Sequence, residues 1–181
     1  VEVEPIYQYK FDTLGEHKVK CTFKKDSLTD CWSMFRWCNL MTKLDLSSLD
    51  TSNVTSMLSM FENCNKLTSL DLSSLDTYKV TDMSGMFNGC SGLTSLDLTP
   101  LDTSKVTDMS SMFRNCSGLT SLTMLGDVSK VTSYSAMFKD ITTTGTLTYN
   151  CDYEDKWNDI CVTNQSGSYF PSTWTKTCIT V

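Results

Sequence analysis

Three aspartates recur at a fixed spacing, and they are the residues of this chain with the clearest potential for chemistry. Asp45, Asp71 and Asp97 each stand between two leucines, and each follows the previous one after 26 residues. Carboxylates placed side by side can hold a cation, accept hydrogen bonds from a polar ligand, or divide the acid and base roles of a hydrolase. The hydrolase needs two carboxylates in unlike surroundings, whereas these three have nearly the same neighbours. We therefore favour binding over hydrolysis.

The other groups that commonly carry chemistry do not combine into a site. His17 is the only histidine, and the cysteines do not complete a set of zinc ligands around it, so we predict a surface residue and no zinc site. The chain has neither a G-x-S-x-G motif nor a phosphate-binding loop. We therefore predict no catalytic residue, no metal and no cofactor.

Nine cysteines would suggest a disulfide framework in a secreted protein, but their positions argue for another interpretation. In the fifth copy of a repeated pattern Ile141 takes the place that cysteine occupies in the other copies, which marks an apolar core position. Cys21 and Cys31 also align with leucine or methionine, so six of the nine are predicted as buried free thiols. At most one disulfide remains, and its pairing is open among Cys151, Cys161 and Cys178. The cysteines at the repeated position are Cys38, Cys64, Cys90 and Cys116.

The elements that position these residues come from one repeated unit. Its phenylalanine recurs in steps of 26, 26, 26 and 25 residues, a period typical of a solenoid whose units pack on their neighbours. Apolar residues alternate with period two across 70–73, which predicts a strand, and fall three or four apart from Val80 to Cys90, which predicts a short helix between Thr81 as N-cap and Gly89 as C-cap. The methionines of this segment are interpreted as core residues. The phenylalanines are Phe35, Phe61, Phe87, Phe113 and Phe138.

The sequence thus predicts an α/β fold, a right-handed solenoid with one parallel strand and one short helix per repeat of about 26 residues. A first strand around Val19 and Cys21 is followed by strands at 43–47, 69–73, 95–99, 121–125 and 146–150. Residues 1–27 are expected to form an N-terminal hairpin cap with the first strand, residues 28–149 the repeats, and residues 150–181 a C-terminal cap. In that cap, Tyr169, Phe170 and Trp174 would cover the last open face, or alternatively form a sugar-binding platform.

Read in register, the strands align their outward side chains in columns. Parallel strands are about 4.8 Å apart, so the aspartates of one column are close enough to repel, with Lys43 able to offset them at one end. A solvated polar face copied by repeat duplication and a ligand-binding strip both explain these columns. The predicted ligand-binding residues are Lys43, Asp45, Ser69, Asp71, Ser95, Asp97 and Thr123. A second set of aspartates, predicted to cap turns, is Asp50, Asp76, Asp102 and Asp127.

The repeat resembles a known family. Leu67, Leu70 and Leu72 follow the L-x-x-L-x-L pattern of leucine-rich repeats, although Leu75 stands where that pattern has its asparagine or cysteine. The stretch DTSKVTDMSSMFRNCSGLTSL, from Asp102 to Leu122, is similar to the BspA-like leucine-rich repeats of bacterial surface proteins. The resemblance implies a cell-surface or secreted bacterial protein with a binding role, and it assigns no ligand.

The net charge and the apolar content of the chain limit the classes of molecule that it is expected to bind. With 15 basic and 21 acidic residues the net charge is -6, which argues against nucleic acid and anionic membranes. No apolar run of about 18 residues is present, so we expect no membrane insertion within this fragment, which begins at Val1 without a signal or anchor. The sequence predicts a monomeric, non-enzymatic module that recognises an extracellular protein, a glycan or a neighbouring cell through its strand face. A structural spacer is the alternative.

Overall fold

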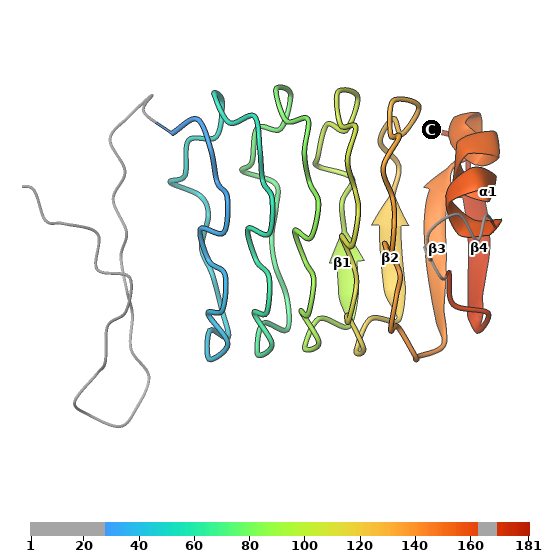
Figure 1. The fold of residues 1–181 in the computed structure, drawn as a ribbon, viewed down its shortest axis with the longest axis horizontal. Helices are drawn as coiled ribbons and strands as arrows, with labels where there is room; N and C mark the ends of the chain where they lie inside the picture. The colour runs from blue at the N-terminus through green and yellow to red at the C-terminus, as the bar shows by residue number, and fades with distance from the viewer. Residues whose placement is uncertain (1–27, 163–169) are drawn as a thin grey trace, which may run out of the picture.

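The fold is built on a parallel sheet. The computed structural model describes residues 28–162 and 170–181, in which the repeats lie side by side in chain order (Figure 1). The sheet has the strand order β1-β2-β3-β4, and few helices accompany it, which confirms the α/β class. Its elements are β1 (Ser95–Asp97), β2 (Ser121–Met124), β3 (Gly145–Asn150), the 3-10 helix η1 (Cys151–Tyr153), α1 (Glu154–Val162) and β4 (Trp174–Ile179).

The strands follow the period-two alternation of the sequence. Leu96 pairs with Leu122 and Leu122 with Leu147, all three buried on the inner side, while hydroxyl and carboxylate side chains point outward. The strands predicted at 95–99, 121–125 and 146–150 are confirmed as β1, β2 and β3. The strands predicted at 43–47 and 69–73 are wrong, because neither segment joins the sheet. The first predicted strand, at Val19 and Cys21, lies outside the described residues.

The sheet begins at β1, where the outward side chain of the repeated Leu-x-Leu or Leu-x-Met segment changes from aspartate to threonine. Pairing begins where Asp97 faces Thr123, and continues where Thr123 faces Thr148. It is absent between the segments that carry Asp45, Asp71 and Asp97 in neighbouring rows. Like charges on adjacent strands oppose pairing. We infer that the repulsion expected from the sequence weakens the rows that carry aspartate beside aspartate.

The predicted helix in each repeat is wrong. Residues 80–90 form consecutive turns, and alternate N–H groups donate to carbonyls of the next repeat, as from Gly85 to Ser110 at 2.8 Å and from Phe87 to Met112 at 3.0 Å. Positive φ angles at Gly85 (62°) and Gly89 (74°) interrupt any helix after each turn. Thr81 is therefore no helix cap, and its hydroxyl donates to the Thr55 carbonyl at 3.4 Å.

The core nevertheless keeps the predicted inward residues. Each turn closes between residues three apart, as from Met86 N to Met83 O at 3.2 Å, so the three-residue apolar spacing still faces inward. The aligned methionines are fully buried, and the phenylalanine rings stack from repeat to repeat with centroids 5.6 to 6.0 Å apart. At the end of this row Phe170 meets Phe138 edge-on at 5.2 Å. The buried methionines are Met57, Met60, Met83, Met86, Met109 and Met112.

The C-terminal residues add a helix and a strand. Asn150 caps η1 by accepting the Asp152 N–H, and α1 buries Trp157 and Ile160. β4 pairs with β3 over six residues, a strand that the sequence analysis did not predict. Phe170 and Trp174 lie with their rings 6.3 Å apart, whereas Tyr169 falls outside the described residues.

Among the described cysteines, all but one agree with the prediction. A disulfide joins Cys151 and Cys178, whose Cα atoms are 4.8 Å apart, and Cys161 is free. Cys31, Cys64, Cys90 and Cys116 are free and buried. The expectation of burial is wrong for Cys38, which is exposed because it belongs to the first described repeat, at one end of the row. Cys21 and His17 lie outside the described residues.

Candidate functional site

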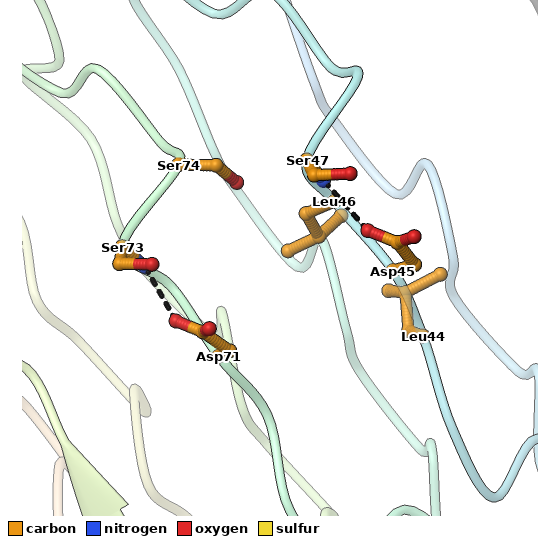
Figure 2. A pocket seen from close by; sticks show the side chains of 7 residues that line it. All are labelled: Leu44, Asp45, Leu46, Ser47, Asp71, Ser73 and Ser74. Atoms are coloured by element: carbon orange, nitrogen blue, oxygen red, sulfur yellow. Dashed lines mark hydrogen bonds between the residues drawn. The ribbon is translucent and has the colours of Figure 1, made fainter.

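A shallow groove on the strand side is the candidate binding site. It has a volume of about 260 Å³ and opens between the two rows that carry Asp45 and Asp71 (Figure 2). These rows are the ones that fail to join the sheet, so the same loss of pairing that shortens the sheet coincides with the groove. It is lined by Leu44, Asp45, Leu46, Ser47, Asp71, Ser73 and Ser74.

Each aspartate of the column is held by its own loop. The N–H of Ser47 donates to Asp45 Oδ1 at 2.9 Å, and the N–H of Ser73 donates to Asp71 Oδ1 at 2.9 Å (Figure 2). Thr99 does the same for Asp97, also at 2.9 Å. A carboxylate that accepts a backbone hydrogen bond two residues on is fixed in direction. The aspartates are therefore preset and do not swing freely.

The same hydrogen bonds favour the charged form of the groove carboxylates. The hydroxyl and the N–H of Ser47 lower the pKa of Asp45. The N–H and the hydroxyl of Ser73 lower the pKa of Asp71. Because both side chains are ionised at neutral pH, the groove offers negative charge and hydrogen-bond acceptors to a ligand.

The structure gathers the predicted site residues on one face but not in one pocket. Asp45 and Asp71 line the groove, while Asp97 and Thr123 lie farther along as a pair on β1 and β2. Lys43, Ser69 and Ser95 are exposed and do not line it. The groove serines Ser47, Ser73 and Ser74 were not predicted from the sequence. The repeated Asp-x-Ser spacing was the available signal, since it is also the spacing of the turn-capping aspartates.

Beyond Asp97 the strand face loses its charge. Ser121, Thr146 and Thr175 lie in register across β2, β3 and β4, and the hydroxyls of Thr146 and Thr175 are 3.2 Å apart. Thr123, Thr148 and Thr177 form the next column of residues aligned across these strands. The face thus has an acidic half and a neutral hydroxyl half.

The turn-capping aspartates are confirmed. Each accepts the N–H two residues on, which explains their repetition by local backbone hydrogen bonding. The pairs are Asp50 with Ser52 at 3.1 Å, Asp76 with Tyr78 at 3.1 Å, Asp102 with Ser104 at 2.9 Å and Asp127 with Ser129 at 2.7 Å.

Two further findings concern the described residues as a whole. Across 28–162 and 170–181, no group of three or more histidine, cysteine, aspartate or glutamate side chains could hold a metal ion. The helical segments in these ranges are too short or too polar to cross a membrane.

The fold and the groove define a repeat protein whose 26-residue units lie side by side and present one polar face. The chain belongs to the family described as Mycoplasma protein of unknown function, DUF285, which matches residues 29–150. The match covers the repeats and β3 and stops before η1, α1 and β4. Among curated proteins, none matches the chain.

Proposed function

We propose that this chain is a non-enzymatic binding module at a bacterial cell surface, which recognises an extracellular protein or glycan through its strand face. The observation that supports it most is the Asp45–Asp71 groove, where fixed carboxylates, serine hydroxyls and two leucines meet. Preset polar groups bind with little loss of side-chain freedom. The groove suits a partner that donates hydrogen bonds, such as a hydroxyl-rich glycan or a polar peptide.

The architecture proposed for this module is a right-handed leucine-rich-repeat solenoid of the BspA-like kind. Support comes from hydrogen bonds that join each repeat to the next along the row, as between Thr120 and Thr94 and between Thr81 and Thr55. A second support is the cysteine column, since Cys90 Sγ donates to the Phe61 carbonyl of the preceding repeat at 3.1 Å. Leucine-rich repeats typically carry an asparagine or cysteine at one position of every unit; here Leu75 stands at that position, and the cysteine column lies elsewhere in the repeat.

The cysteines support a location outside the cytosol. Disulfides persist in oxidising compartments, and Cys151 and Cys178 form one. Two of the buried free thiols are protected, because burial raises the pKa of Cys64 and of Cys116 to about 12 and keeps these thiols protonated. One disulfide beside inert buried thiols fits a protein that functions at the cell surface or after secretion.

The test compares two triple variants. Asp45→Asn, Asp71→Asn and Asp97→Asn together remove the strand-face charge, while Asp50→Asn, Asp76→Asn and Asp102→Asn remove the same charge from turns on another edge. Both sets keep an oxygen that accepts the local N–H. Purified proteins would be assayed on arrays of glycans and extracellular matrix proteins. We expect the first variant to lose at least about tenfold in affinity for any partner found, and the control to keep it.

The spacer function is the second candidate. It is favoured by near-identical outward residues in successive repeats, since a tailored site would vary them, as in Leu-Asp-Leu-Ser at both 44–47 and 70–73. A partner that bound the strand-face variant as tightly as the parent would show the face to be passive. Failure of the parent to bind any array component, with circular dichroism showing a folded protein, would favour the spacer.

A further inference from the structure

The last strand of the sheet leaves one edge open. β4 pairs with β3 along Trp174–Ile179, and no other strand of the described residues pairs with its outer side. In Figure 1 β4 is the last strand of the row, and α1 lies next to it at that end. An unpaired strand edge presents N–H and C=O groups that can pair with another chain. Something in β4 must oppose such pairing if the protein is to stay a single copy.

The inner side of the sheet shows a break at this strand. The first three strands place Leu96, Leu122 and Leu147 in one inward column, and all three are buried. The register of β3 with β4 puts Lys176 next in this column, opposite Leu147. Lys176 is exposed, and its Nζ donates to Asn158 Oδ1 of α1 at 2.7 Å. A charge therefore stands where the pattern of the sheet calls for leucine.

We propose that Lys176 keeps the free edge of β4 from pairing with a second copy of this chain. Two copies related by a two-fold axis would pair their β4 strands in antiparallel fashion. Any register that pairs most of the six residues brings the two Lys176 side chains opposite each other or onto nearby pairs, because Lys176 lies near the middle of the strand. Like charges so placed repel, and pairing would also remove both from water.

The rest of the strand would favour association without this charge. Thr175 and Thr177 have high strand propensity, and Ile179 and Val181 expose 40% and 77% of their surface at the end of the chain. An inward-pointing lysine on an edge strand is a recognised way to block edge-to-edge contact. This inference does not depend on the proposed binding function, since it concerns a different edge of the molecule.

The experiment restores the leucine column. Lys176→Leu would be compared with the parent and with Lys130→Leu, which removes an exposed lysine from a turn outside the sheet. Analytical ultracentrifugation over a range of concentrations gives the association constant. We expect the parent and the control to sediment as monomers, and Lys176→Leu to associate at least about tenfold more tightly than either. Lys176→Arg, which keeps the charge, should remain monomeric.

Three outcomes would overturn the proposal. They are a folded Lys176→Leu that stays monomeric at every concentration, a control that associates equally, and a parent that is already a dimer cross-linked through β4. If Lys176→Leu fails to fold by circular dichroism, Lys176→Thr serves instead, since threonine suits a strand and removes the charge without adding a large apolar group. A folded, monomeric Lys176→Thr would equally count against the inference.

Discussion

At the scale of single residues, side chains that recur in every repeat satisfy backbone groups of a neighbouring repeat. Cys64 Sγ donates to the Phe35 carbonyl at 3.2 Å, and Cys116 Sγ donates to the Phe87 carbonyl at 3.1 Å. Buried Thr77 donates in the same manner to the Asp102 carbonyl at 3.0 Å. The cysteine column is predicted to be apolar because Ile141 aligns with it. That interpretation accounts for the size of the side chain, but it missed the hydrogen bond that Cys64, Cys90 and Cys116 each donate to a carbonyl of the preceding repeat.

The buried thiols predict how stability depends on alkaline pH. Burial raises the pKa of Cys64 and Cys116 from 9.0 to about 12, so the native state holds these protons more tightly than the unfolded state. Their stabilising contribution is complete below pH 9 and is lost as pH rises toward 12. We expect the free energy of unfolding, measured with urea at a series of pH values, to fall across this window. The fall should be smaller in Cys64→Val, and an unchanged slope in that variant would contradict the assignment.

At the scale of elements, the segment predicted as a helix in each repeat shows the limit of predicting structure from apolar spacing. Both a helix and a row of hydrogen-bonded turns place apolar residues three or four apart, so the spacing of Val80, Met83 and Phe87 cannot distinguish them. The deciding signal lay in the positions with positive φ. One column holds Asn63, Gly89, Asn115 and Asp140, which are residue types that tolerate this conformation, with Trp37 as the exception. Gly89 alone was interpreted, as a helix cap, and its equivalents in the other repeats were not compared with it.

The sheet was easier to predict than its extent. The alternation of apolar and polar residues located β1, β2 and β3 because it indicates which side chains are buried. It does not indicate whether the strand segments of neighbouring repeats will pair. β4 was missed because Lys176 and Cys178 stand at the two positions where the repeats carry the leucines of the Leu-x-Leu pattern. At the site, Asp45 and Asp71 were predicted from their spacing in the sequence. The groove depends on the distance between two neighbouring repeats, and the residues of one repeat do not determine that distance.

The aspartate rows predict a change in the sheet on neutralisation. In the variant with Asp45→Asn, Asp71→Asn and Asp97→Asn, the repulsion between neighbouring rows is removed while each loop keeps its acceptor. We expect residues 69–73 to pair with β1, and their backbone amides to gain protection in hydrogen exchange followed by mass spectrometry. The turn-aspartate control should show no gain in this peptide. Equal exchange in parent and variant would mean that charge is not what separates the rows.

At the scale of the whole molecule, the repeats form a row in which each unit packs on its neighbours. The phenylalanine rings of successive repeats stack along this row, and Phe170 ends it against Phe138. In such a row the loss of one end weakens the units nearest to it more than distant ones. The C-terminal end has its own covalent tie, since the Cys151–Cys178 disulfide links η1 to β4 and encloses α1.

Removing the Cys151–Cys178 disulfide should destabilise the C-terminal elements more than the first repeats. The bond closes a loop across a sequence separation of 27 residues, for which the chain-entropy relation gives a loss of about 3.5 kcal/mol in Cys151→Ala with Cys178→Ala. Urea unfolding would measure this loss. Hydrogen exchange should show faster exchange in α1, β4 and β3, because β3 depends on β4 as its outer partner, while the peptides around Met57 and Met60 keep their protection. A Cys161→Ala variant, which keeps the disulfide, is the matched control and should leave β4 protected. Uniform loss of protection from the first repeat to the last would contradict the idea that each repeat is stabilised mainly by its neighbours. It would show that the protein unfolds in one cooperative step.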